Sequence, residues 1–362
     1  MFYLLSGLLG DSYIIFNVFR YITFRSIMSA ITSFMLCIFL GPYVIERLKQ
    51  FGVRHDSKKP FTEAIHAWSE TKSQIPTMGG LLIIVSIITA LLLWGNLQNR
   101  FILWLIAIVL WFGFVGFIDD WIKIRRQYSI GLRSRTKFAG QVILGTVLGW
   151  YLFVRPHGPI GLYMPFFKSI FIPLGILYIP FVVAVLVGTS NAMNLTDGMD
   201  GLAIGCLIMA AGAFTIITYA TGHAVFSKYL NIPFVAEAGE LAVACAALVG
   251  AGAGFLWFNA YPANIFMGDT GSLSLGGCLG AIAIFVKQEL VLLIVGGVFV
   301  WEALSVILQV TSFRLRGKRI FKCSPYHIHL QMCGWPESKI TIRLWIVAFV
   351  LALIGLSTLK LR

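Results

Sequence analysis

The sequence predicts an all-α polytopic membrane protein with about ten transmembrane helices. Its 362 residues are 58% hydrophobic and only 12% charged, which is too apolar for an ordinary soluble protein. Ten segments are long and apolar enough to cross a bilayer, which takes roughly 17–25 residues. Glycine is abundant, at 36 residues, as the close packing of membrane helices favours.

The ten predicted spans follow the apolar runs of the sequence. In chain order they cover residues 27–45, 78–94, 101–118, 138–154, 170–187, 202–220, 241–258, 268–286, 290–310 and 342–359. The eighth and tenth depart most from an ideal span, because each is short or has polar residues near one end. No soluble segment of useful size separates the spans, so residues 1–362 are expected to form a single integral membrane domain.

Lysine and arginine predict how the chain lies in the membrane. Most of the 28 basic residues fall in the loops after the first, third and ninth spans. The positive-inside rule places these loops in the cytoplasm and both termini on the periplasmic side. The net charge of +13 therefore marks orientation and is compatible with anionic substrates, and no nucleic-acid-binding architecture accompanies it.

Two segments outside the predicted spans have local structure of their own. The first 26 residues lack the basic start and the cleavage site of a signal peptide, so we expect a helix in the membrane interface. The loop 155–168 has turn-forming glycine and proline between apolar residues, which predicts either a short periplasmic hairpin or a plain connector. Four of the six cysteines lie within spans and two in a cytoplasmic loop, so no disulfide is expected.

Two adjacent carboxylates end the third span. Asp119 and Asp120 precede Lys123 by four and three residues, so on a continuing helix the lysine lies near both. Adjacent carboxylates at a helix end can bind a divalent cation or share a proton. A solvated, capped helix end explains the pair alone equally well.

The loop between the fifth and sixth spans combines amides, carboxylates and glycines. It has the sequence NAMNLTDGMDGLA over residues 191–203 and contains no cation. Asn194, Asp197 and Asp200 suit the recognition of a nucleobase or of ribose hydroxyls, and the glycines permit close backbone approach. The alternative is a helix N-cap motif.

The eighth span begins in an acidic turn flanked by glycines. Asp269 follows Gly268 within the stretch FNAYPANIFMGDTGSLSLGG, where the helix is expected to start. Free amides at a helix N-terminus bind phosphate, and the aspartate could hold magnesium against it. Asn259 and Phe266 flank the turn, and an aromatic face here could stack on a base.

The last cytoplasmic loop contains alternating histidines. His327 and His329 point the same way in an extended segment. With two nearby cysteines they could imitate a zinc site, but their spacing matches no usual zinc pattern, and contact with phosphate fits better. Glu302, within the ninth span, is a functional candidate, although a structural hydrogen bond or a helix break explains it as well.

Aspartates thus gather where spans meet loops on one face of the membrane. Carboxylates beside hydrocarbon are costly unless something binds them. Their convergence from three loops predicts a site for a metal ion and a phosphate ligand. The five are Asp119, Asp120, Asp197, Asp200 and Asp269.

At these residues the chain resembles the phospho-N-acetylmuramoyl-pentapeptide transferases of bacterial cell-wall synthesis, within the polyprenyl-phosphate N-acetylhexosamine-1-phosphate transferase superfamily. The resemblance covers nearly the whole chain. The run from NAYPA to GDTGS is its most specific part, because it separates this family from relatives that transfer N-acetylglucosamine phosphate. The matching stretches are PTMGG (76–80), DDWIK (119–123), RTKFAGQ (135–141), NLTDGMDGLA (194–203), NAYPANIFMGDTGSL (259–273) and the histidine loop.

The resemblance implies an activity, a cofactor and a location. An enzyme of this family transfers phospho-MurNAc-pentapeptide from UDP-MurNAc-pentapeptide to undecaprenyl phosphate, which releases UMP and forms the first lipid-linked peptidoglycan precursor. It requires Mg²⁺ and lies in the bacterial cytoplasmic (inner) membrane, with its active site facing the cytoplasm. The expected partners are these substrates, membrane lipid and a second copy of the chain in a homodimer, with no nucleic acid.

The resemblance also implies roles for individual residues. Asp119, Asp120 and Asp269 match the essential catalytic acids, and Asp269 is the expected magnesium ligand. Other residues of this chain match positions at which the family binds the nucleoside or the phosphates of its substrates. The nucleoside positions are Lys72, Thr77, Asn194, Asp197, Asp200, Asn259, Phe266, Gly268 and Gln309, and the phosphate positions are Lys123, Lys137, His327 and His329.

The chain departs from the family pattern in its histidine loop. The family has three consecutive histidines followed two residues later by glutamate, whereas this chain has Ile328 in the middle and Gln331 in place of the acid. These changes question any mechanism that needs the central histidine. Ile75 also replaces a common threonine before the PTMGG stretch, which affects only local packing.

Several alternatives stay open at the level of the sequence. Asp119 could remove the proton of the lipid phosphate for direct attack on the β-phosphorus, or an aspartate could first form a phosphosugar-enzyme. A transferase that uses UDP-N-acetylglucosamine is the nearest rival activity. A transporter would bury charges near mid-membrane, where Glu302 is the one candidate.

Overall fold

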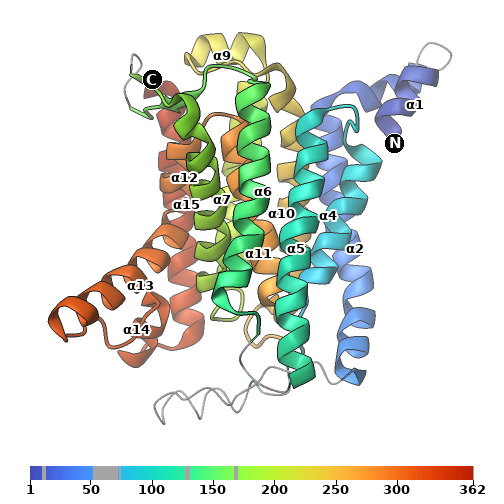
Figure 1. The fold of residues 1–362 in the computed structure, drawn as a ribbon. Coiled ribbons are helices and arrows are strands. Elements are labelled where there is room, and N and C mark those ends of the chain that lie inside the picture. The colour runs from blue at the N-terminus through green and yellow to red at the C-terminus, as the bar shows by residue number, and fades with distance from the viewer. Residues whose placement is uncertain (10–13, 52–71, 73–74, 127–130, 167–169, 362) are drawn as a thin grey trace.

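The computed structural model describes residues 1–9, 14–51, 72, 75–126, 131–166 and 170–361. Over these residues the chain is a bundle of helices with one two-stranded sheet, which confirms an all-α polytopic membrane protein (Figure 1). Eight of the described helices are long and apolar enough to cross a membrane. They are α2 (Ile22–Gln50), α5 (Arg100–Arg126), α6 (Ser134–Val154), α7 (Tyr178–Thr196), α8 (Leu202–Thr221), α10 (Leu241–Asn259), α13 (Gly297–Arg316) and α15 (Glu337–Leu361).

The other two predicted spans form α4 (Gly80–Trp94) and α11 (Gly268–Phe285). α4 has 15 residues, and α11 begins with an acidic, glycine-rich turn. α11 lies in the middle of the bundle, where it contacts α4, α5, α7 and α8 (Figure 1). Nearly all of its side chains are buried, as expected for a helix that is apolar on every side.

Glycines let α4 and α5 approach the first turn of α11 very closely. A Cβ atom on Gly80 would lie 2.1 Å from the backbone nitrogen of Gly271. A Cβ atom on Gly116 would lie 2.2 Å from the carbonyl oxygen of Asp269. Real side chains do not tolerate such distances, so both positions require glycine. The close approach brings the carboxylate pair of α5 beside the start of α11.

The fifth predicted span begins too early. Residues 171–173 of this span form the strand β2 (Phe171–Pro173), which pairs antiparallel with β1 (Gly161–Tyr163). β1 lies in the loop 155–168, where a short hairpin or a plain connector was predicted, and β2 lies beyond it. The short 3-10 helix η2 (Gly175–Leu177) follows, and α7 starts only at Tyr178. Aromatic and β-branched residues suit a strand as well as a membrane span, and Pro173 cannot donate a helical hydrogen bond.

The ninth predicted span is broken into two helices. α12 (Glu289–Val295) and α13 are joined at Gly296, so two consecutive glycines stand at the junction. Glycine pairs are common sites of helix kinks, because no side chain holds one helical path. α13 leans away from the bundle, and α14 (Tyr326–Met332) lies beneath it (Figure 1).

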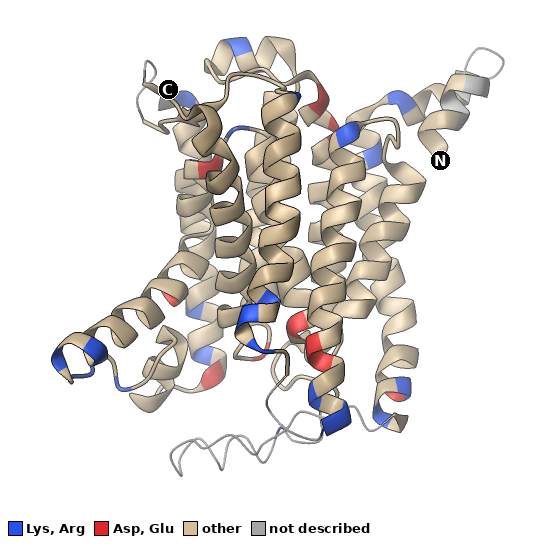
Figure 2. Cartoon of the chain, in the orientation of Figure 1, with Lys and Arg blue, Asp and Glu red and all other residues tan. Residues whose placement is uncertain are grey.

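Both termini lie at one end of the bundle, which we call the terminal end (Figure 1). Here α1 (Phe2–Leu9) and the 3-10 helix η1 (Ile14–Arg20) precede the first span, in the segment expected to contain an interfacial helix. α9 (Ala224–Leu230) and the 3-10 helix η3 (Ala236–Glu240) also lie at this end. Figure 2 shows acidic and basic residues at both ends of the bundle, and the end opposite the termini, which we call the site end, includes the charged ends of α5 and α13. Most of the loop 46–77 lies outside the described residues.

Candidate active site

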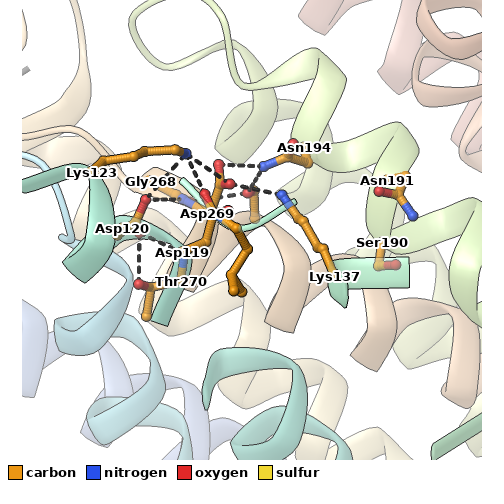
Figure 3. A network of polar contacts seen from close by, with 12 residues as sticks. Asp119, Asp120, Lys123, Lys137, Ser190, Asn191, Asn194, Gly268, Asp269 and Thr270 are labelled. Carbon is orange, nitrogen blue, oxygen red and sulfur yellow. Dashed lines mark hydrogen bonds and ion pairs between the residues drawn. The ribbon is translucent and has the colours of Figure 1, made fainter. Parts of the chain in front are cut away.

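Three aspartates from two helices meet at the site end. Asp119 and Asp120 lie on α5, and Asp269 lies in the first turn of α11 (Figure 3). Each offers one carboxylate oxygen, and these oxygens lie within 4.8 Å of one another. Asp119 and Asp120 are buried, and Asp269 is half-buried. The structure therefore brings together carboxylates that are distant in sequence, since Asp120 and Asp269 are separated by 149 residues.

Asp120 holds the start of α11 in place. Its carboxylate accepts hydrogen bonds from the backbone nitrogens of Asp269, at 3.2 Å, and Thr270, at 2.9 Å. It also accepts from the Thr270 hydroxyl at 2.7 Å. The amides of a first helical turn have no partner within their own helix, and the helix dipole favours a negative charge there. Asp120 thus caps α11 from a neighbouring helix and fixes the position of Asp269.

Two lysines face the aspartates. Lys123, one turn after Asp119, forms an ion pair with it and reaches Asp269 Oδ2 at 3.0 Å. Its ammonium also lies 3.8 Å from Asp120 Oδ1, so the spacing predicted for Lys123 is confirmed. Lys137, on α6, reaches the same oxygen of Asp269 at 2.7 Å (Figure 3). Two predicted phosphate-handling residues therefore lie beside the carboxylates.

When all three carboxylates are ionised, the cluster carries more negative than positive charge. Three carboxylates contact two ammonium groups, and Asn194 adds a neutral hydrogen bond to Asp269 Oδ1 at 2.8 Å. Carboxylate oxygens are the ligands that a hard divalent cation such as Mg²⁺ prefers. Within the described part of the chain, this is the one group of three or more His, Cys, Asp or Glu side chains that could hold a metal ion.

A second polar cluster surrounds Asp200. Lys72 makes ion pairs with Asp200 and with Glu337, the latter at 2.7 Å. Glu337 also accepts a hydrogen bond from the backbone nitrogen of Asp200, and Asp200 accepts one from Ala263. Burial raises the pKa of Asp200, although Lys72 opposes the shift. Sequence reasoning missed Glu337, whose one signal is an acid in the first turn of the last span.

Asp197 lies at the C-terminal end of α7, and carboxylates of both clusters affect its pKa. Burial raises its pKa to about 8, and the carboxylates of Asp269, Asp120 and Asp200 add to the shift. A hydrogen bond from the Gly268 backbone opposes it. Near neutral pH the Asp197 side chain is therefore mostly protonated, and it can donate a hydrogen bond as well as accept one.

Several predicted nucleoside-site residues lie in the segment before α11. Asn259 Oδ1 accepts a hydrogen bond from the Gly201 backbone at 3.1 Å, and its Nδ2 donates to the Ile265 carbonyl at 2.8 Å. Asn259 therefore ties this segment to the loop of Asp200. The ring of Phe266 lies 5.7 Å from Lys72 Nζ, so the aromatic face and the Asp200 cluster are neighbours.

Gly268 has a backbone conformation and surroundings that exclude other residues. Its φ angle is +73°, which favours glycine. A Cβ atom here would lie 2.7 Å from Asp120 Oδ2 and 3.0 Å from Thr77 Oγ1. Thr77 therefore lies against the same turn as the aspartates.

His327 pairs with Glu302 beside the loop of Asp197. His327 Nδ1 lies 3.1 Å from Glu302 Oε2, and the His327 backbone nitrogen donates to the same carboxylate. A Cβ atom on Gly198 would lie 2.3 Å from His327 Nε2, so this histidine packs against that loop. The structure shows a hydrogen-bonded Glu302, which was one of the interpretations of this residue. His329 Nε2 lies 3.9 Å from Cys333 Sγ, but in the described residues no group of three or more metal-binding side chains contains a histidine or a cysteine.

Gln309 and His329 contact the loop after α13. Gln309 Oε1 accepts hydrogen bonds from the backbone nitrogens of Ile320 and Phe321, and its Nε2 donates to the Phe321 carbonyl. His329 Nδ1 accepts from the Lys322 backbone at 3.2 Å. The role of Gln309 at the nucleoside and that of His329 at the phosphates stay predictions.

An apolar cavity of about 310 Å³ lies between α7, α11, α12 and α13. Its lining is mostly aliphatic and includes Met193, Leu279 and Phe299. The glycine junction of α12 and α13 contributes Gly296 to the wall. The helix break thus shapes an apolar space inside the membrane-spanning part of the molecule.

Comparison with known proteins defines the class of protein to which this fold and site belong. Residues 101–287, which contain all three clustered aspartates, match the glycosyl transferase family 4. The chain is therefore a membrane-embedded transferase of that class.

Full-length relatives narrow the class. The chain is 50% identical over 363 residues to the phospho-N-acetylmuramoyl-pentapeptide-transferase of Geobacter sp. (strain M21), with 100% of both chains covered. It is 49% identical, over 363 residues and 100% of both chains, to the protein of that name from Citrifermentans bemidjiense. It is 48% identical to that of Desulforapulum autotrophicum, over 352 residues and 96% of each chain. The chain belongs to the phospho-N-acetylmuramoyl-pentapeptide transferase family, as its motifs indicated.

Proposed function

We propose that this chain transfers phospho-MurNAc-pentapeptide from UDP-MurNAc-pentapeptide to undecaprenyl phosphate and releases UMP. The product is the first lipid-linked peptidoglycan precursor. The observation that carries the proposal is the meeting of Asp119, Asp120 and Asp269 with Lys123 and Lys137 at the site end. The family membership supplies the identity of the two substrates.

The carboxylate cluster fits a divalent cation, and we propose that the ion is Mg²⁺. Asp269 is the principal ligand in this proposal, because it is the least buried of the three. The N-terminal end of α11 favours the ionised form of its carboxylate, which is the form that binds a cation. Asp119 lies within reach of the same ion. When bound, Mg²⁺ neutralises the diphosphate and the leaving UMP.

The remaining residues of the cluster divide the other tasks. The oxygens of Asp120 are engaged by the first turn of α11, so Asp120 is a positioning residue. Lys123 and Lys137 stabilise the phosphate oxygens of the two anionic substrates. Asp119 accepts the proton of the lipid phosphate, whose freed oxygen then attacks the β-phosphorus as the bond to UMP breaks.

The second cluster is the proposed nucleoside site. Phe266 offers a ring for stacking on the uracil, and Asp197 and Asp200 offer groups for its polar edge or for the ribose hydroxyls. Lys72 lies between Phe266 and Asp200 and orients both. The remaining proposed contacts to the nucleotide are made by Thr77, Asn194, Asn259 and Gly268.

The acceptor lipid suits the apolar cavity. The cavity of about 310 Å³ lies among helices that would be in contact with hydrocarbon, and its wall accommodates part of a polyprenyl chain. We also propose that the protein lies in the bacterial inner membrane as a homodimer, with the site end facing the cytoplasm. The basic residues at the site end support this orientation (Figure 2).

A comparison of two donor substrates tests the proposed function. The purified protein is reconstituted in liposomes with undecaprenyl phosphate and Mg²⁺, and the release of UMP is measured. We expect release with UDP-MurNAc-pentapeptide and little or none with UDP-N-acetylglucosamine. Equal or faster release from UDP-N-acetylglucosamine would assign the chain to the rival activity.

A further inference from the structure

The C-terminal end of α13 carries an unusual concentration of positive charge. Arg314, Arg316, Lys318 and Arg319 lie within six residues, and we call them the basic tip. All four are exposed. Figure 2 shows basic residues at this end of α13, away from the bundle and from the aspartates. The basic tip is therefore separate from the aspartate cluster.

No acidic side chain among the described residues forms an ion pair with the basic tip. The sequence has no Asp or Glu between Glu302 and Glu337, and in the described ranges no carboxylate forms an ion pair with any of the four cations. Lys123 and Lys137, by contrast, each contact Asp269. The charge of the basic tip is thus available to an external anion.

The loop that carries the basic tip has a defined fold. Gly317 takes the left-handed conformation, with φ of +66°, and ends α13. The Ser312 hydroxyl donates to the Lys318 carbonyl at 2.9 Å. Gln309 binds the backbone of Ile320 and Phe321 just beyond. These contacts hold the backbone of the loop against the helix, so the backbone positions that carry the cations are set before any ligand binds.

Exposed apolar side chains alternate with the cations. Phe313 is 56% exposed, Leu315 79% and Ile320 55%. Side chains of this kind insert into the boundary between headgroups and acyl chains, while neighbouring lysines and arginines contact phosphate. α13 is long and apolar enough to span a membrane, so its end lies where headgroups would be.

From this pattern we propose that the basic tip binds the phosphate groups of anionic phospholipids in the leaflet at the site end. The proposed ligand is membrane lipid. A soluble anion would contact only the cations, whereas a lipid would also bury the exposed apolar side chains between them. Binding here would hold the outer end of α13, which leans away from the other helices. Since α13 lines the apolar cavity through Phe299 and Leu304, the bound lipid would also stabilise one wall of that cavity.

Native mass spectrometry of the full-length protein tests the proposal. The wild type is compared with the variant R314Q/R316Q/K318Q/R319Q, each in detergent with added phosphatidylglycerol or with zwitterionic phosphatidylcholine. A matched control is R125Q/R126Q, which removes two exposed cations from the end of α5 at the same end of the molecule. A second control, R314K/R316K/R319K, keeps the charge.

We expect the fourfold glutamine variant to bind phosphatidylglycerol at least about tenfold more weakly than the wild type. Phosphatidylcholine binding should not change, and both controls should bind like the wild type. Inorganic phosphate at millimolar concentration should not displace the lipid. Displacement by phosphate would show a general anion site, and equal binding by the fourfold variant and the wild type would overturn the proposal.

Loss of folding would not hide the result. The pairs R314Q/R316Q and K318Q/R319Q each remove half of the charge, and each should show an intermediate loss of phosphatidylglycerol binding. Thermal unfolding of every variant in the same detergent checks that the bundle is intact. If folded variants of both pairs bind the lipid as the wild type does, the proposal is wrong.

Discussion

Buried charges occur at both ends of this molecule, but they are balanced in different ways. At the terminal end, Arg25 donates to Glu240 through two nitrogens, at 2.6 and 2.5 Å, so one cation matches one anion. At the site end, Asp119, Asp120 and Asp269 share two lysines. A matched pair is complete without a ligand, whereas an unmatched cluster is completed by an added cation.

The surroundings of the matched pair show what it does. Arg25 also donates to the Trp94 carbonyl, and the backbone nitrogen of Asn96 donates to Glu240. The pair therefore connects the start of α2, the end of α4 and the start of α10. Its role is structural, and substitutions at the two ends should have opposite consequences for activity and stability.

The largest expected effect is on turnover, from Asp269→Asn. This change keeps the shape of the side chain and removes the charge that we assign to the metal ion. We expect turnover to fall about a thousandfold or more, and extra Mg²⁺ to restore little of it. UMP release by the variant in proteoliposomes measures the loss. Turnover close to the wild-type value would remove Asp269 from the metal site.

Glu240→Gln should have the reverse effect. It leaves Arg25 buried without a compensating charge, so we expect a loss of about 3 kcal/mol or more in the free energy of unfolding. The turnover of the molecules that remain folded should stay near that of the wild type. Thermal unfolding in detergent, together with the activity of the folded fraction, checks both parts. A stable variant with impaired turnover would contradict the structural role of the pair.

Gly116→Ala should damage the site without changing any charged residue. The new methyl group would meet the Asp269 carbonyl at 2.2 Å, so α5 and α11 would move apart. A displacement of about 1 Å at a reacting centre can cost about a hundredfold in rate, and we expect a loss of that order. The matched control is Gly212→Ala on α8, where a Cβ atom meets nothing within 4 Å. Equal turnover of the two variants would show that the close approach is not needed.

The smallest expected effect concerns pH and Asp197. The pKa of this group is about 8 in the folded protein, against an ordinary value of 3.8. The unfolded chain therefore loses this proton near pH 4 and the folded chain only near pH 8, so the contribution of Asp197 to stability falls as pH rises between these values. Asp197→Asn should remove this dependence, which we expect to lessen the fall in unfolding temperature between about pH 5.5 and 7.5 by about 2 °C. Identical pH profiles would show that Asp197 titrates normally.

Much of the fold followed from hydropathy, and the exceptions have physical causes. Every predicted span contains helix, because a run of apolar residues long enough to cross the bilayer has few other stable structures. Hydropathy did not show the break at Gly296, since glycine pairs also occur in unbroken membrane helices. It also joined the strand Phe171–Pro173 to the fifth span, because that strand is apolar too.

The sequence predicted which residues form the site better than it predicted the hydrogen bonds between them. Asp119, Asp120 and Asp269 stand out as acids at the ends of apolar runs, and the structure brings them together. The capping of α11 by Asp120 could not be foreseen, because it depends on how closely Gly116 lets α5 approach. The hydrogen bonds of Gln309 to the loop after α13 could not be foreseen either, because the sequence does not show which way that loop folds, and the role of Gln309 at the nucleoside stays a prediction.

The central claim is that the unmatched carboxylates hold one divalent cation, and Mn²⁺ binding without substrate tests it most directly. Electron paramagnetic resonance counts free Mn²⁺ as it is titrated into the wild type, Asp269→Asn and Glu240→Gln. We expect one Mn²⁺ for each wild-type or Glu240→Gln chain, displaced by Mg²⁺, and binding at least about tenfold weaker in Asp269→Asn. Wild-type affinity in Asp269→Asn would contradict the account.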